Sequence, residues 1–299
     1  QKRQRIETIG GDWVEQVIVD GTFDRANAQA QEAARHSGRT YVHPYDDPCT
    51  IAGQGTIAVE LEEQVLSEAA AVLVPVGGGG LLSGIATWIR SRFPDIKIYG
   101  VEPTGAASMA AAMEADQVVS LPSVDPFVDG TAVGRAGELP YSIVKELVDD
   151  ILVVPEGAVC TEMLDLYHSD GVIAEPAGAL ASAAARMYFS DPEQRNELLG
   201  GKEGAIVAIV SGGNNDMTRY AEIMERSLRH EGLRHDDRER REGDIDAEDL
   251  QIGSDQASAT PGDQEGQARD DRRKNHGQSD HGAQDSRPPC IARPSTHQR

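Results

Sequence analysis

The sequence contains one run of four consecutive glycines: Gly77, Gly78, Gly79 and Gly80. The run follows an apolar stretch typical of a buried parallel strand, and a helical pattern over residues 80–93 comes directly after it. Glycines without Cβ atoms allow successive backbone N–H groups to point at one anion, and the positive end of a following helix adds to the attraction. The motif predicts a phosphate site at the carboxyl edge of a sheet. A flexible turn is the alternative, but an ordinary turn does not need four glycines.

The residues around the glycines indicate which phosphate would bind. A nucleotide-binding P-loop ends in Gly-Lys-Ser/Thr, whereas Leu81 and Leu82 follow here with no lysine. A dinucleotide fingerprint, GxGxxG, fails in both reading frames, because its last position is Leu82 or Ser83. Glu102 ends the next strand, where a ribose-binding acid would sit, so a Rossmann-type nucleotide binder stays open. Glu102 is equally explained as a helix-initiating residue, and a monophosphate cofactor fits best.

A second motif, Ser211-Gly212-Gly213, follows the apolar stretch 205–210. It would lie at the same rim as the glycine run, because the carboxyl ends of parallel strands share one edge of the sheet. The Ser211 hydroxyl could hydrogen-bond a neutral ring nitrogen without forcing its protonation, as a carboxylate would. Taken alone, this motif is better explained as a glycine turn with a capping serine. Together, the two motifs predict one ligand with a phosphate and a ring nitrogen.

The elements that position these motifs alternate along the chain. Strands are predicted over 13–19, 40–45, 70–77, 97–103, 151–157 and 205–213. Helices are predicted over 23–38, 51–66 (with Thr50 as N-cap), 80–93, 107–116, 158–171, 176–190 and 217–232. Such repetition predicts an α/β fold with a parallel sheet flanked by helices.

The composition narrows the classes of partner. A net charge of −22 repels phosphate backbones and anionic lipids, which argues against nucleic acid and membrane surfaces. No apolar run has the length of a membrane span, and no signal peptide is visible. The three cysteines, Cys49, Cys160 and Cys290, are far apart, which favours a reducing, cytoplasmic location and no zinc site. From about residue 233 to 299, apolar residues and periodicity almost vanish, so a disordered tail or an out-of-frame segment is expected.

Five motifs together resemble the threonine dehydratase family, in the family's own order. They are VPVGGGGLLSG (74–84), SGGNN (211–215), HPYDDPCTIAGQGTIAVEL (43–61), FVDGTAV (127–133) and IAEPAGALA (173–181). The family comprises fold-type II pyridoxal-phosphate (PLP) enzymes, with the tryptophan synthase β-like fold, related to serine dehydratases. The likeness spans about residues 1–232. It implies residues 1–40 as a remnant of the smaller domain and 41–232 as the larger, PLP-binding domain.

The resemblance also implies roles for the two motifs. Gly77, Gly78, Gly79, Gly80 and Leu81 would hold the phosphate of PLP, and Ser211 would meet the pyridine nitrogen. The family deaminates threonine to 2-oxobutanoate and ammonia, for isoleucine biosynthesis, and its members commonly form homo-oligomers. The remaining marked residues have two interpretations each: Glu175 faces the cofactor ring or favours a helix start, and Asp129 helps a cation site or caps a turn. Cys160 is expected in the core, and His43 in a loop near the rim.

The sequence departs from the family's pattern at the catalytic lysine. Neither the Ser-Phe-Lys-x-Arg-Gly-like motif that forms the Schiff base nor the Ser-x-Gly-Asn-His-like loop is present. The lysines are Lys2, Lys97, Lys145, Lys202 and Lys274, and none lies in such a setting. We therefore expect a fragment without its Schiff-base lysine and without the isoleucine-sensing regulatory domain. Serine dehydratase or racemase chemistry and an inactive fragment remain alternatives.

Overall fold

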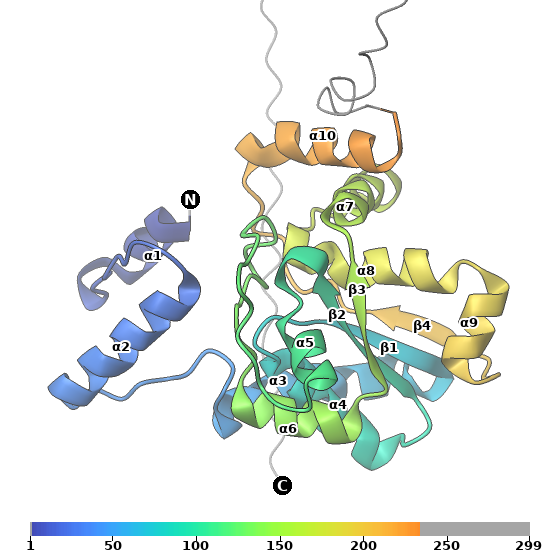
Figure 1. Ribbon diagram of the computed structural model, residues 1–299, viewed down its shortest axis with the longest axis horizontal. Coiled ribbons are helices and arrows are strands. Elements are labelled where there is room, and N and C mark those ends of the chain that lie inside the picture. Colours follow the sequence, from blue (N-terminus) through green and yellow to red (C-terminus); the bar gives the residue numbers. More distant parts are fainter. Residues whose placement is uncertain (1, 234–299) are drawn as a thin grey trace, which may run out of the picture. The chain divides into compact units, whose positions relative to one another are not determined.

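A four-stranded parallel sheet lies at the centre of residues 2–233, the part of the chain that the computed structural model describes (Figure 1). The strand order is β3-β2-β1-β4. The strands are β1 (Ala69–Pro75), β2 (Lys97–Pro103), β3 (Asp150–Val154) and β4 (Ala205–Ala208). The predicted α/β class with a parallel sheet is confirmed.

Strand β1 occupies an inner position because its sequence is apolar throughout. All seven of its residues are buried. It pairs in parallel with β2, where Val72 is opposite Ile98, and with β4, where Val72 is opposite Val207. A strand covered on both faces needs a continuous apolar run, which is what AAAVLVP supplies.

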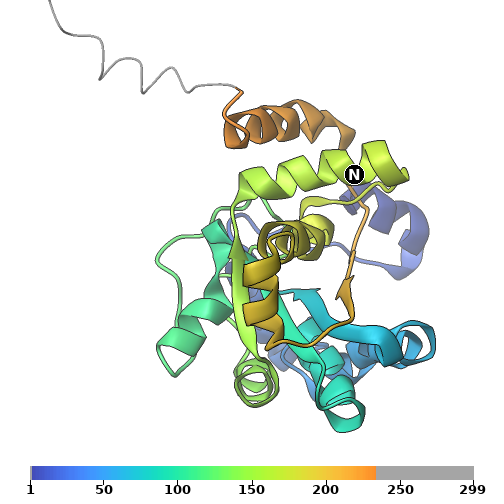
Figure 2. The same ribbon diagram turned by 90° about the vertical axis from the view of Figure 1, so that its right-hand side faces the viewer.

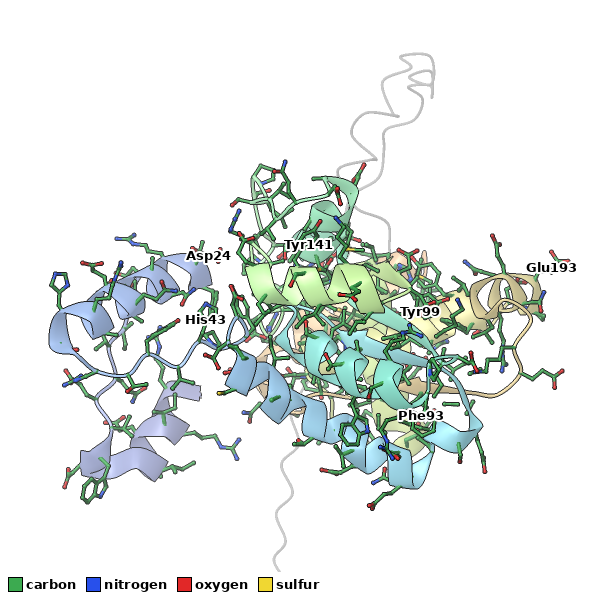
Figure 3. The ribbon with its side chains drawn as sticks, turned by 90° about the horizontal axis from the view of Figure 1, so that it is seen from below. Asp24, His43, Phe93, Tyr99, Tyr141 and Glu193 are labelled. Atoms are coloured by element: carbon green, nitrogen blue, oxygen red, sulfur yellow. The ribbon has the colours of Figure 1, made fainter. Side chains whose placement is uncertain are left out.

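Helices cover both faces of the sheet. On one face α3, α4 and α6 lie side by side (Figure 3), and on the other face α8, α7 and α10 are stacked outward from the sheet (Figure 2). Their bounds are α3 Pro48–Gln64, α4 Gly80–Arg92, α6 Glu138–Leu147, α7 Glu156–Asp170, α8 Pro176–Phe189 and α10 Tyr220–His230. The remaining α-helices are α1 Lys2–Gly10, α2 Phe23–Ser37, α5 Ser108–Glu114 and α9 Pro192–Leu199. Short 3₁₀ turns cover Gly11–Trp13, Leu66–Glu68, Thr104–Ala106 and Met217–Arg219.

The two faces carry separate cores, as the alternation of side chains along a strand requires. Leu73 packs with Leu180 of α8 and other residues of one core. Its neighbour Val72 packs with Ile85 of α4 in the other core. Both cores are built mainly from alanine, valine, leucine and isoleucine, so helices approach the sheet closely.

Two predicted strands are wrong. Residues 13–19 and 40–45 form no strand, and most apolar side chains there are exposed, with Trp13 97% and Val42 74% exposed. Apolar alternation marks a strand only if neighbouring strands supply hydrogen bonds, and the described residues offer none to these segments. The predicted helix 23–38 is confirmed as α2, ended by Gly38 with φ of 68°.

Other boundaries move for local reasons. Helix α3 begins earlier than predicted, because Asp47 rather than Thr50 is its N-cap: the Asp47 carboxylate accepts bonds from the amides of Cys49 and Thr50. Strand β4 ends at Ala208, short of the predicted 213. The helices α6 and α9 were not predicted; α9 starts at the Asp191 cap with Pro192 next to it.

Two parts of the predicted organisation stay predictions. The disordered tail, 233–299, lies almost wholly outside the described residues, and the division into domains near residue 40 has no separate support. None of the helices between residues 2 and 233 combines the length and apolarity that crossing a bilayer demands.

The crossing of α3 and α4 gives a test of the packing. A Cβ atom at Gly84 would lie 2.3 Å from the carbonyl oxygen of Ile51 and 2.6 Å from the amide nitrogen of Gly55. Gly84→Ala must push the helices apart, so we expect the free energy of unfolding in urea to fall by about 1–3 kcal/mol. Gly53→Ala is the matched control, because nothing lies within 4 Å of a Cβ there. It should gain roughly 0.5–1 kcal/mol from helix propensity; equal effects of both substitutions would contradict the close crossing.

Candidate functional site

One cavity of about 350 Å³ opens at the carboxyl ends of β1 and β4. It is lined by every predicted site residue: Gly77, Gly78, Gly79, Gly80, Leu81 and Ser211. The glycine loop leaves β1 and starts α4, and Ser211 follows β4, which is the direct neighbour of β1. The structure therefore brings the two motifs together, as parallel neighbours in a sheet require.

Three glycines of the loop also have a local structural reason to lack a side chain. A Cβ atom at Gly78 would lie 2.2 Å from Cγ of Tyr45, and one at Gly77 would lie 3.1 Å from Cα of Thr131. Gly79 has φ of 95°, a conformation that favours glycine. Close contacts and backbone conformation are thus enough to explain why these positions are glycine, so a phosphate site must be judged from the backbone amide groups of the loop.

The backbone of the loop has donors without acceptors. The carbonyl oxygens of Gly78 and Gly79 accept bonds from the amides of Gly137 and Ser83, at 3.1 and 3.0 Å. The amide N–H groups of Gly77, Gly78 and Gly79 have no acceptor within residues 2–233. Buried amides without partners are costly, and these lie next to the N-terminus of α4, where a helix attracts anions. The loop can therefore hold a phosphate.

The Ser211 segment is fixed through its glycines. A Cβ atom at Gly212 would lie 2.3 Å from Oε1 of Glu175, and the amide of Glu175 donates to the Gly212 carbonyl oxygen at 3.0 Å. Glu175 lines the cavity and also immediately precedes α8, so both of its predicted interpretations agree with its position. The Ser211 side chain is left at the exposed edge of the cavity.

Several lining residues were not singled out from the sequence, and two of them, Tyr45 and Thr131, pack on the glycine loop. Tyr45 packs against Gly78, and burial, the largest cause, raises the pKa of its phenol to about 12. Thr131 lines the cavity together with Asp129 and Gly130, and it packs against Gly77. The sequence indicated Tyr45 and Thr131 only indirectly, through the glycines on which they pack. A glycine that packs on a ring or on another backbone cannot be distinguished in sequence from one that binds a ligand.

The loop around Tyr45 is held by hydrogen bonds within itself and with the start of α6. Nδ1 of His43 accepts bonds from the amides of Tyr45 and Asp46, and burial, the largest cause, lowers the pKa of His43 although Asp46 and Asp47 raise it. The Asp46 carboxylate accepts from the amides of Glu138 and Leu139 and so starts α6. His43 lies in the loop before α3 and is not among the residues that line the cavity.

Glu102 has a structural role. Its side chain is fully buried, and its two oxygens accept bonds from the amides of Met109 and Ala110, each at 2.8 Å. It does not line the cavity, so the ribose-binding role is not supported and the helix-initiating role is confirmed. Burial raises the pKa of Glu102 to about 7, against the lowering effect of the three backbone amides of residues 108–110.

None of the described lysine side chains reaches the cavity. Lys97 pairs with Asp149 at 2.7 Å, Lys145 pairs with Asp116, and Lys202 donates to a backbone carbonyl at 2.9 Å. Among residues 2–233 no group of three or more His, Cys, Asp or Glu side chains is arranged to hold a metal. Cys160 is buried, in line with its predicted core position. Burial is the largest cause that raises the pKa of its thiol, to about 12.

Comparison with known proteins identifies the class. Residues 1–212 match the model of the family described as "Pyridoxal-phosphate dependent enzyme". The chain belongs to this family, whose cofactor is pyridoxal phosphate.

The similar proteins include threonine dehydratases and a serine racemase. The biosynthetic L-threonine dehydratase of Corynebacterium glutamicum is 47% identical over 240 residues, which are 79% of this chain and 53% of that protein. The processed form of threonine deaminase isoform 2 from Solanum lycopersicum has a TM-score of 0.67 at 38% identity, over 76% of this chain and 63% of that one. Maize serine racemase has a TM-score of 0.65 at 32% identity, over 77% and 68%. The chain spans about half the length of the curated relatives it matches.

The residues present fit a pyridoxal phosphate molecule. Three neighbouring amides without acceptors suit its phosphate, and a serine hydroxyl across the same cavity suits a pyridine nitrogen. The cavity volume of about 350 Å³ lies within the range of small-molecule sites, roughly 300–1,000 Å³.

The titration of Glu102 gives a test of this buried carboxyl. Its pKa is about 7 in the folded chain and has an ordinary value of 4.5, so folding favours the protonated form. Its contribution to stability is therefore complete below about pH 4.5 and is lost as the pH rises through about 7. In the parent protein, the free energy of unfolding should fall between about pH 5 and pH 8. In Glu102→Gln this fall should be smaller by roughly 2–3 kcal/mol than in the parent protein, because an amide does not titrate.

The measurement is urea unfolding at several pH values. Glu63→Gln, which changes an exposed glutamate of α3, is the control and should keep the slope of the parent protein. If Glu102→Gln also keeps that slope, the carboxyl of Glu102 does not titrate in this range.

Proposed function

We propose that this chain forms the cofactor-binding part of an enzyme that uses pyridoxal phosphate to deaminate L-threonine to 2-oxobutanoate and ammonia. One observation carries the proposal: the glycine loop with its three unpaired amides and Ser211 line a single cavity. The 47% identity to a biosynthetic threonine dehydratase supports the choice of reaction within the family.

The proposed roles follow from the chemistry of each group. The amides of Gly77, Gly78 and Gly79, together with Gly80, Leu81 and the start of α4, would hold the phosphate and anchor one end of the cofactor. The Ser211 hydroxyl would hydrogen-bond the pyridine nitrogen and leave it neutral. When bound, the cofactor supplies an electron sink that makes the proton on the substrate's Cα acidic. Tyr45 and Thr131 would exclude water from the two sides of the cavity.

Two alternatives each have a supporting observation. The similarity to maize serine racemase favours a serine dehydratase or racemase. The side chains of Lys97, Lys145 and Lys202 all pair away from the cavity, which favours a chain that binds pyridoxal phosphate without turnover of its own. In each case the proposal includes a cytoplasmic homo-oligomer that acts on a free amino acid, with neither nucleic acid nor membrane as partner.

The activity test uses the polypeptide as the gene encodes it, purified with added pyridoxal phosphate. L-threonine and L-serine are supplied separately, and 2-oxobutanoate, pyruvate and D-serine are measured by chromatography. Formation of 2-oxobutanoate in excess of pyruvate supports the threonine reaction. Excess pyruvate or D-serine would replace it with a serine reaction, and cofactor binding without any product would support the non-catalytic alternative.

The binding test separates the two ends of the cofactor. Removing one hydrogen bond with Ser211→Ala should weaken pyridoxal phosphate binding about three- to tenfold. The affinity for inorganic phosphate should not change, because the phosphate would lie at the glycine loop. Pyridoxal without its phosphate should bind the parent protein about a hundredfold more weakly, since it lacks the charged hydrogen bonds. Equilibrium dialysis gives all three affinities.

Ser190→Ala removes an exposed hydroxyl after α8, outside the cavity, and is the matched control. It should leave every affinity unchanged. Equal binding of pyridoxal and pyridoxal phosphate would contradict the phosphate site at the glycine loop.

A further inference from the structure

An irregular segment, residues 125–133, contributes to the wall of the cavity and packs against the glycine loop. It belongs to the long connection between α5 and α6, which extends toward α10 in Figure 1. Asp129, Gly130, Thr131, Ala132 and Val133 of this segment line the cavity. The segment is neither helix nor strand. It contains turn hydrogen bonds of its own, such as that from the Thr131 amide to the Val128 carbonyl oxygen at 3.0 Å, and contacts with other elements fix its position.

The segment packs against two other parts of the cavity wall, the glycine loop and the start of α8. A Cβ atom at Gly77 would lie 3.1 Å from Cα of Thr131, so the segment lies against the glycine loop. A Cβ atom at Gly130 would lie 2.7 Å from Cβ of Ala177, at the start of α8. A small outward movement of the segment would therefore widen the cavity at the loop and at α8 together.

Its outer side is held by two arginines that come from the chain after β4. Phe127 is 3% exposed, and the guanidinium groups of Arg226 and Arg219 lie 4.0 and 4.8 Å from its ring centroid. Arg219 also donates from Nη2 to the Phe127 carbonyl oxygen at 2.8 Å. A cation held over an aromatic face is stabilised more strongly as the pair is shielded from water; here the ring is buried, and the side chains of Arg219 and Arg226 are 26% and 34% exposed.

The charges of the two arginines are balanced by acids of the segment and of α10. Arg226 lies 3.9 Å from Asp125, and Arg219 lies 3.9 Å from Asp129. Glu222 of α10 pairs with both, at 3.1 Å to Arg226 and 3.9 Å to Arg219. The network links the start and the middle of the segment to one helix.

We propose that Arg219 and Arg226 are positioning residues that hold segment 125–133 as a wall of the cofactor cavity. The proposal rests on the proposed function in one respect, that the occupant is pyridoxal phosphate. Neither arginine is among the residues that line the cavity, so they would act through Phe127, which fixes where Asp129, Gly130 and Thr131 lie. Cofactor affinity then depends on the chain after β4, a part remote from the glycine loop in sequence.

The experiment combines local hydrogen–deuterium exchange with cofactor binding. The variants are Arg219→Ala, Arg226→Ala, the double substitution, and Phe127→Leu, which keeps an apolar side chain without a ring face. Arg226→Lys retains the charge and tests rescue. Arg229→Ala is the matched control for Arg226→Ala, because it removes the same charge from the same helix, α10, at a residue that pairs with Glu225.

We expect amide exchange in residues 125–133 to become about tenfold faster in Arg226→Ala, while exchange in β1 stays unchanged. Dialysis with pyridoxal phosphate should show about three- to tenfold weaker binding in the same variant. Arg226→Lys should recover part of both effects, and Arg229→Ala should show neither.

Three results would overturn the proposal: unchanged exchange in 125–133 in the double variant, an equal rise in β1, which would mean general loss of stability, or faster exchange with unchanged affinity. If the parent protein binds no pyridoxal phosphate, the proposed function fails. The exchange data still decide, independently, whether the arginines hold the segment.

Discussion

The cavity depends on the parallel pairing of β1 with β4. Because the two strands are neighbours and run in one direction, their carboxyl ends meet at one edge of the sheet. The glycine loop and the segment of Ser211 are more than 130 residues apart in sequence, yet they line one cavity for this reason alone. Val72 and Leu73 of β1 send their side chains to opposite cores, so the strand that carries the glycine loop is anchored on both faces.

Close approach of backbones is the second requirement. Gly84 allows α4 to cross α3, and Gly178 allows α8 to approach Gly212. A Cβ atom at Gly178 would lie 2.2 Å from the Gly212 carbonyl oxygen. Any side chain at either position would move a helix that borders the cavity. The scarcity of large aromatic residues in the chain follows from the same close packing.

The segment before α3 contrasts with the rest of the described chain. Helix α2 has no buried residue, and Ile9, Trp13 and Val17 are each more than two-thirds exposed. Exposed apolar side chains do not contribute the free energy that burial would provide. The apolar sequence pattern of this segment is therefore not matched by burial of its side chains. The two mispredicted strands lie in this segment, where pattern alone was present and pairing partners were not.

Local sequence determined most of the elements. The apolar run of β1, the Gly38 cap of α2 and the Pro94 that follows α4 each act within a few residues, so they can be recognised from sequence. The fold class and the predicted site residues at 77–81 and 211 followed from these elements and from the resemblance to a family. Such features depend on neighbours along the chain, which a sequence displays directly.

Only the tertiary structure decided the features that depend on neighbours in space. It placed Tyr45 and Thr131 against the glycine loop, buried Glu102 away from the cavity, and set Arg219 and Arg226 over Phe127. It also left residues 13–19 and 40–45 unpaired, since a strand forms only where another supplies its hydrogen bonds. No local pattern encodes such contacts, because each joins residues far apart in the chain.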